Sequence, residues 1–140
     1  MDLFYNKSNN MTEKNKKVLL VEDDSAIIDI YRMMIEKAGF DVEVITLGQE
    51  VIGRIRDQKD KEPLKPDIVL LDLILPDING MEVLKTIRTD ESTKDIRVFI
   101  LTNQEESQLT QMGSIKPDKF IIKANITPTQ LVELIKKELK

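Results

Sequence analysis

The sequence contains no cysteine and no histidine among its 140 residues. Without cysteine, the protein can form no disulfide and offers no thiolate nucleophile. Without histidine, it lacks a side chain that often serves in acid–base catalysis and in metal sites. Carboxylates, hydroxyl groups and lysines must therefore carry any chemistry that the protein performs.

The sequence also lacks an apolar run of the ~20 residues that span a bilayer. Its polar first residues lack the apolar core of a signal peptide, so we expect a cytoplasmic protein with no membrane partner. The 21 basic and 25 acidic residues give a net charge of −4. This balance gives no electrostatic reason to expect binding to nucleic acid, so we predict no nucleic-acid partner. The length fits one domain over residues 16–140, after a disordered tail over residues 1–15.

Short apolar runs alternate with helical patterns after the tail. Strands are expected at 17–22, 42–44, 68–72, 98–102 and 120–123, and helices at 27–38, 49–58, 81–89, 105–112 and 128–139. In the first helix, an apolar stripe includes Ile27, Ile30, Tyr31, Met34 and Ile35. The alternation predicts an α/β protein with a five-stranded parallel sheet and helices on both faces, in a doubly wound (βα)5 arrangement.

Local signals mark several turns and helix starts. Thr127 and Gln130 predict a capping box at the start of the last helix, with Pro128 at its first position. Asp24 alone is best interpreted as a turn or capping residue. Asp67 and Asp77, each beside a proline, are interpreted as turn formers.

Polar side chains stand at the ends of four expected strands, at the sheet edge where function gathers in open α/β folds. These residues are Glu22, Asp23, Asp24, Asp72, Thr102 and Lys123. If the first and third strands are neighbours, three or four carboxylates converge on one pocket. Close carboxylates repel one another unless a cation joins them, and an oxygen-only site suits Mg²⁺.

Such a site suits phosphoryl chemistry, in which a lysine and a hydroxyl bind phosphate oxygens. Asp72 is then a plausible covalent acceptor, because carboxylates can form aspartyl phosphates. Taken singly, Thr102 could be an ordinary β-branched strand residue and Lys123 a surface charge. Acidic, hydroxyl and basic residues each stand at the end of an expected strand, and this combination favours a functional site.

The runs VLLVEDD, DIVLLDLILPDINGMEVL, VFILTN and FIIK resemble the receiver domain of response regulators. The resemblance covers roughly residues 16–140, and it implies a flavodoxin-like fold with strand order 2-1-3-4-5. It further implies that Asp72 is the phosphoacceptor, paired with Lys123 and approached by the switch hydroxyl of Thr102. Phe120 matches the aromatic switch residue.

The same resemblance implies a Mg²⁺ site. Asp23 matches the direct ligand, and Glu22 matches the acid that acts through metal-bound water. Asp72 also contacts the metal, and the position of Ile74 supplies a backbone carbonyl.

By this resemblance, a histidine kinase or phosphotransfer protein supplies phosphate, and output comes from a phosphorylation-dependent protein interaction. The face formed by the fourth helix, fifth strand and fifth helix is the expected output surface. The protein is then a monomer or a phosphorylation-dependent dimer, has no output domain, and is no enzyme beyond assisting its own phosphorylation and dephosphorylation. A role as an intermediate carrier that passes the phosphoryl group along a phosphorelay is equally compatible with the sequence.

Two alternatives stay open beside this interpretation. One is a receiver-like scaffold that binds partners without phosphorylation. The other, less favoured, is an Asp-nucleophile phosphatase, a class that usually carries a second acid where this sequence has Ile74.

Three features depart from the family pattern. Ala124 follows Lys123 where the family usually has proline, often with a cis bond, so we predict a trans or reshaped loop. Asn103 follows Thr102 where a very small residue is usual, and its amide could crowd the phosphoryl site or orient the attacking water. The fourth helix is short and polar.

Overall fold

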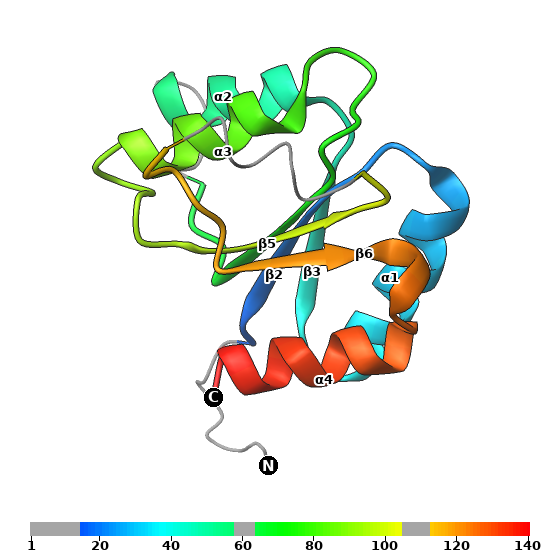
Figure 1. Ribbon diagram of the computed structural model, residues 1–140. Helices are drawn as coiled ribbons and strands as arrows, with labels where there is room; N and C mark the ends of the chain where they lie inside the picture. Colours follow the sequence, from blue (N-terminus) through cyan, green and yellow to red (C-terminus); the bar gives the residue numbers. More distant parts are fainter. Residues whose placement is uncertain (1–14, 58–63, 105–112) are drawn as a thin grey trace.

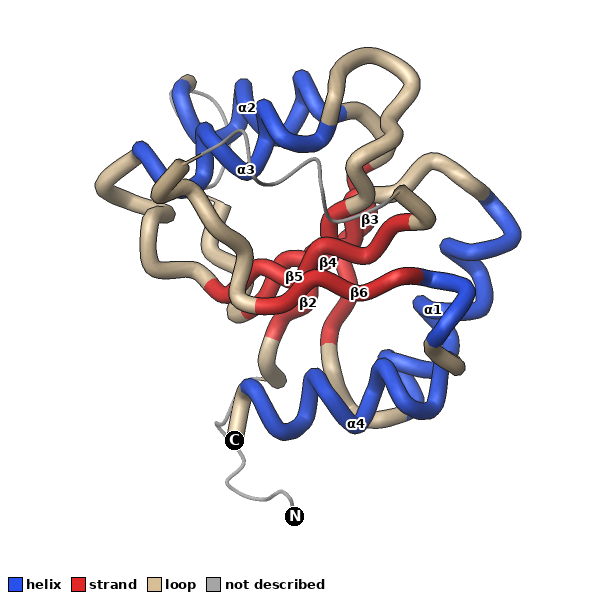
Figure 2. Tube along the Cα trace, viewed as in Figure 1, coloured by secondary structure: helices blue, strands red, loops and turns tan. Residues whose placement is uncertain are grey.

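Five strands form one sheet in the computed structural model, which describes residues 15–57, 64–104 and 113–140. Neighbouring strands all pair in parallel, in the order β3-β2-β4-β5-β6. Counted along the chain, this is the predicted order 2-1-3-4-5 of the flavodoxin-like fold. Figure 2 shows the strands in red, between the helices labelled α2 and α3 and those labelled α1 and α4. The strands are β2 (Lys17–Val21), β3 (Asp41–Ile45), β4 (Ile68–Leu71), β5 (Arg97–Thr102) and β6 (Lys119–Ile122).

Helices cover both faces of this sheet. They are α1 (Ser25–Lys37), α2 (Gly48–Arg56), α3 (Gly80–Thr89) and α4 (Pro128–Glu138), and the short 3₁₀ turn η2 (Lys123–Asn125) precedes α4. Helices α2 and α3 lie together on one face, and α1 and α4 lie on the other (Figure 1). The predicted helix 105–112, part of the loop before β4, and the predicted tail 1–15 apart from Asn15 lie outside the described residues.

The sheet separates two hydrophobic clusters. Along β2, Leu19 and Val21 pack with α2 and α3, whereas Val18 and Leu20 pack with α1 and α4. Strands β4 and β5 alternate in the same way, so their side chains are buried on both faces. This double burial explains why the strands have continuous apolar runs in place of an apolar–polar alternation.

Helix termini follow the predicted signals. The side chain of Asp24 accepts the backbone N–H groups of Ala26 and Ile27 and so caps α1. Thr127 and Gln130 form the predicted capping box of α4, in which each side chain bonds the backbone of the other residue. These caps satisfy N–H groups that the helices cannot bond internally.

Ile30 belongs to the apolar stripe of α1 in the sequence, but 46% of this residue is exposed. Tyr31 and Ile35 are buried in the cluster under α1, and Ile27 and Met34 are half-buried beside them. Ile30 lies about 100° around the helix axis from Tyr31. The apolar stripe in the sequence is therefore wider than the arc of α1 that the sheet covers.

Candidate functional site

Four of the predicted site residues stand where the strands end, along one edge of the sheet. Glu22 follows β2, Asp72 follows β4, Thr102 is the last residue of β5, and Lys123 follows β6. Strands β2, β4 and β6 each end one residue earlier than predicted. Glu22 and Asp72 therefore lie just past the strand ends.

Lys123 joins the two buried carboxylates. Its Nζ atom lies 2.5 Å from Glu22 Oε1 and 2.7 Å from Asp72 Oδ2. The side chain of Lys123 is only 10% exposed, that of Glu22 3% and that of Asp72 8%. Residues 101 and 51 positions apart in sequence thus meet in one desolvated group.

The second oxygen of each carboxylate is held by the backbone. Glu22 Oε2 accepts the N–H groups of Asp23 at 3.1 Å and Asp24 at 3.2 Å. Asp72 Oδ1 accepts the N–H of Ile74 at 3.1 Å. Each carboxylate is therefore oriented from both sides, by an ammonium group and by peptide dipoles.

Burial and charge oppose each other at this group. Burial raises the pKa of the Glu22 carboxyl, and the hydrogen bonds from Lys123 and Asp24 only partly offset this effect. Burial also lowers the pKa of Lys123, but the hydrogen bonds to Asp72 and Glu22 prevail and raise it. With both acids ionised, two carboxylates and one ammonium leave one net negative charge, which favours a further cation.

The expected convergence of three or four carboxylates is not seen. Within the described parts of the chain, no three acidic side chains form a group that could hold a metal ion. Asp23 is exposed, Asp24 caps α1, and Lys123 bridges the remaining pair. The lysine thus supplies part of the positive charge that two neighbouring carboxylates require.

The donor chemistry still fits Mg²⁺. This ion takes one or two carboxylates and keeps several waters, so it requires no cage of protein ligands. Glu22 and Asp72 are held together by one ammonium group, and Asp23 lies next to Glu22 in an exposed position. All three side chains offer oxygen ligands, which is the ligand type that Mg²⁺ prefers.

A tight turn follows Asp72 and requires glycine at its end. Ile74 and Asn79 form an isolated antiparallel bridge, and the N–H of Gly80 donates to the carbonyl of Leu73 at 2.7 Å. A Cβ atom at Gly80 would lie 2.3 Å from the carbonyl oxygen of Asp72. The backbone of the candidate phosphoacceptor therefore contacts Gly80 directly, and no larger residue fits there unchanged.

The two predicted switch residues occupy different environments. Thr102 is fully buried, and its hydroxyl oxygen accepts the N–H of Gln104 at 3.4 Å. Phe120 is half-buried on β6, paired with Ile100, and packs against the cluster under α2 and α3. They lie on the last two strands of the sheet, Thr102 on β5 and Phe120 on the edge strand β6.

The predicted trans geometry after Lys123 is confirmed. The Lys123–Ala124 peptide bond is trans, and Lys123 begins the 3₁₀ turn η2. The side-chain oxygen of Asn103 accepts the N–H of Ala124 at 3.1 Å. The two residues that depart from the family pattern are thus bonded to each other.

Two aspartates have structural roles that the sequence did not reveal. Asp77 accepts the N–H groups of Gly48 and Gln49 and so caps α2 from a distant loop. Asp67 accepts the N–H of Lys17 at the start of β2. The one available signal was that Leu47, the residue before α2, offers no capping side chain, so another residue had to supply the cap.

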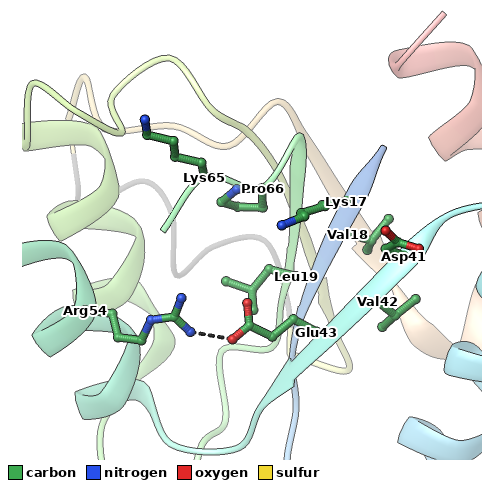
Figure 3. A pocket seen from close by; sticks show the side chains of 9 residues that line it. All are labelled: Lys17, Val18, Leu19, Asp41, Val42, Glu43, Arg54, Lys65 and Pro66. Carbon is green, nitrogen blue, oxygen red and sulfur yellow. Dashed lines mark hydrogen bonds and ion pairs between the residues drawn. The ribbon is translucent and has the colours of Figure 1, made fainter. Parts of the chain in front are cut away.

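A concave region lies at the opposite end of the sheet from Lys123 (Figure 3). Its volume is about 260 Å³, and its lining includes Lys17, Asp41, Glu43, Arg54 and Lys65. Arg54 donates to Glu43 and thereby links α2 to β3. Charges of both signs line this region, so it favours neither cationic nor anionic ligands, and the group around Lys123 remains the stronger candidate.

A bilayer-spanning helix is not found in the described ranges: none of their helices is both long enough and apolar enough.

Comparison with known proteins gives a family match over most of the chain. The family model of the response regulator receiver domain matches residues 18–136. The chain is 38% identical over 86 residues to the DNA-binding dual master transcriptional regulator RpaA of Synechocystis. The aligned region covers 61% of this chain and 33% of RpaA. It is 28% identical over 131 residues to the DNA-binding response regulator MtrA of Mycobacterium tuberculosis, covering 93% of this chain and 53% of MtrA.

A solved structure agrees over a similar range. The phosphorylated cyanobacterial phytochrome response regulator RcpA has a TM-score of 0.71 and 27% identity to this chain. The match covers 89% of this chain and 91% of the RcpA chain. By contrast, the matched regions are about half of MtrA and a third of RpaA.

Proposed function

Because the chain belongs to the response regulator receiver domain family, we propose that Asp72 accepts a phosphoryl group from a histidine kinase or a phosphotransfer protein. Receiver domains of two-component response regulators are phosphorylated on an aspartate. The observation that carries the assignment to Asp72 is its buried contact with Lys123, 2.7 Å away. A lysine held against a buried carboxylate is ready to bind the oxygens of a phosphoryl group placed there.

The proposed transfer forms one bond and breaks one. A carboxylate oxygen of Asp72 attacks the phosphorus of a phosphohistidine on the donor protein. The O–P bond forms, and the bond from phosphorus to the imidazole nitrogen of the donor breaks. The leaving imidazole takes up a proton. Before the step, the hydrogen bonds to Asp72 and Glu22 raise the pKa of Lys123, so the lysine enters the step as an ammonium group. Its ammonium group can then turn from Asp72 to a phosphoryl oxygen without a proton transfer.

Mg²⁺ is the proposed cofactor, as receiver domains generally bind it at the phosphorylation site. Glu22, Asp23, Asp72 and the backbone carbonyl of Ile74 would hold it. When bound, the ion neutralises charge on the phosphoryl oxygens. The residues themselves orient the acceptor, since Lys123 and the N–H of Ile74 fix the two oxygens of Asp72.

The proposed output is a protein interaction that changes with phosphorylation. Thr102 would move toward the phosphoryl group and Phe120 would turn inward, which biases a two-state element. Strand β6 and helix α4 present an apolar groove that includes Phe120, Ile121, Ile126 and Leu134. We place the downstream protein target on this surface, with the protein a monomer or a phosphorylation-dependent dimer.

The protein in this proposal is a signalling phosphoacceptor that assists its own phosphorylation and dephosphorylation and acts on no separate substrate. A response regulator receiver domain interacts with histidine kinases and downstream targets. MtrA and RpaA are DNA-binding proteins of which the matched region is only a part. That this chain binds no nucleic acid stays a prediction.

Intact-mass analysis tests the assignment. The protein is incubated with Mg²⁺ and acetyl phosphate, and a single phosphate addition is expected. Asp72→Asn should abolish the addition, while Asp95→Asn, at an exposed aspartate, should leave it unchanged. Full addition to Asp72→Asn would refute the assignment. No addition to the folded wild-type protein would favour the scaffold alternative.

A further inference from the structure

The turn that carries Lys123 is anchored by a residue of another strand. The N–H of Ala124 donates to Asn103 Oδ1 at 3.1 Å, and Asn103 comes directly after β5. The two residues are 21 positions apart in sequence. This hydrogen bond therefore joins the ends of β5 and β6 just beyond their last ladder pair, Thr102 with Ile122.

The 3₁₀ turn has few other means of fixing its start. Ile122, the residue before the turn, provides no side-chain cap. The internal bond of the turn runs from the N–H of Ile126 to the carbonyl of Lys123, at 3.3 Å. An N–H group in the first turn of a helix needs an external acceptor, and Asn103 supplies one to the residue directly after Lys123.

This anchor matters because the Lys123 side chain is long and its head has two partners. While the ammonium group contacts Glu22 and Asp72, those contacts also hold the turn in place. During phosphorylation the ammonium group must exchange a contact with Asp72 for one with a phosphoryl oxygen. At that moment the ammonium group keeps only its contact with Glu22, so the backbone position of Lys123 depends more on β6 and on the hydrogen bond from Ala124 to Asn103.

We infer that Asn103 is a positioning residue, which holds the Lys123 turn by accepting the N–H of Ala124 and so directs the lysine toward Asp72. The inference rests on the proposed function, in which Lys123 serves phosphoryl transfer. Asn103 does not act on the phosphoryl group in this scheme. Its Oδ1 atom accepts the N–H of Ala124, and the inference assigns Asn103 this contact with the backbone and no action on the phosphoryl group.

The substitution Asn103→Ala removes the acceptor, and Asn125→Ala is the matched control. Asn125 lies in the same turn and is exposed, so the control changes the same residue type close to Lys123. Asn103→Asp keeps an acceptor oxygen and should preserve the anchor. Folding of each variant is verified by circular dichroism.

The first readout is the NMR signal of the Lys123 ammonium group in Mg²⁺-free buffer, identified by through-bond correlation. A sharp, slowly exchanging signal is expected in the wild type, in Asn103→Asp and in Asn125→Ala, and a broadened or lost signal in Asn103→Ala. The second readout is the rate of phosphorylation by acetyl phosphate with Mg²⁺. This rate should fall about two- to tenfold in Asn103→Ala, the scale of one ordinary hydrogen bond, and stay unchanged in Asn125→Ala.

The outcomes separate the two claims. A wild-type Lys123 signal in Asn103→Ala overturns the inference, and a changed rate alongside that signal would assign Asn103 a direct role at the phosphoryl site. The absence of a slowly exchanging signal in the wild type also overturns it. If the signal is lost in Asn103→Ala but the wild-type protein takes up no phosphate, the proposed function fails while the anchoring of Lys123 stands.

Discussion

Asp77 caps helix α2 from a loop 29 positions further along the chain: its Oδ1 atom accepts the backbone N–H of Gly48 at 2.9 Å. Its Oδ2 atom accepts the next N–H, that of Gln49, at 2.8 Å. The neighbouring Ile78 packs so closely on Gly48 that a Cβ atom there would lie 2.6 Å from Ile78 Cγ1. The turn that follows Asp72 is therefore fastened to the start of α2 by a carboxylate and by an apolar contact.

Removing this cap should destabilise the fold. Asp77→Ala leaves two N–H groups of α2 without their acceptor, and we expect the free energy of unfolding to fall by about 1 kcal/mol. Asp77→Asn keeps an acceptor oxygen and should lose much less. Urea denaturation at neutral pH measures both. Equal losses in the two variants would contradict a capping role.

The charge of Asp77 should make its contribution depend on pH. Desolvation works to raise its pKa, but the N–H groups of Gln49 and Gly48 prevail and lower the pKa below its ordinary value of 3.8. A carboxyl with a lowered folded-state pKa contributes stability above its unfolded pKa, and this is lost as pH falls through the folded pKa. The stability difference between wild type and Asp77→Asn should thus shrink on acidification below about pH 4. A difference that stays constant in a pH series of urea denaturations would contradict this.

Gly80→Ala should damage the fold and the site together. The added Cβ atom would lie 2.3 Å from the Asp72 carbonyl oxygen and 2.7 Å from the Leu73 Cα atom, both in backbone that cannot easily yield. We expect a lower free energy of unfolding and slower phosphorylation by acetyl phosphate. Gly53→Ala is the control, because its Cβ atom meets nothing within 4 Å. In the middle of α2 it should stabilise by about 0.5–1 kcal/mol, and a similar gain in Gly80→Ala would refute the close approach.

Lys123→Met should change how stability depends on pH. It leaves Glu22 and Asp72 buried without their cation, a loss of about 3–5 kcal/mol when such groups stay charged. Protonation of one acid relieves the repulsion, so the folded-state pKa of the pair rises above its unfolded value. Stability of the variant should then increase as pH falls from about 7 to about 5. Thermal unfolding across this range gives the test, and a variant with the same pH profile as the wild type would contradict it.

The sequence was sufficient to predict the sheet, because β2, β4 and β5 have apolar residues on both faces and a polar residue at or just after their ends. It was likewise sufficient for the caps at Asp24 and Thr127, which act within a few residues of their own position. The role of Asp77 was missed because a cap supplied from 29 positions away leaves no local pattern. The exposure of Ile30 depends on how much of α1 the sheet covers, which only packing decides.

The arrangement at the site shows the same limit. The strand ends indicated that Glu22, Asp72 and Lys123 would meet, and they do. That the ammonium lies between the carboxylates, while Asp23 stays exposed, depends on side-chain directions that residue spacing does not determine. The roles of Thr102 and Phe120 in switching stay predictions.

The alternation of side chains along β5 has a consequence for how this segment can vary among related genes. Val98 and Ile100 belong to one cluster, whereas Phe99 and Leu101 belong to the other. A deletion or insertion of one residue inside β5 would exchange the two sets and displace Thr102 from its place at the strand end. Replacement of one apolar residue by another is far milder. Length changes should therefore accumulate in the segments between strands and not within residues 97–102, because an altered residue count between strands shifts no strand register.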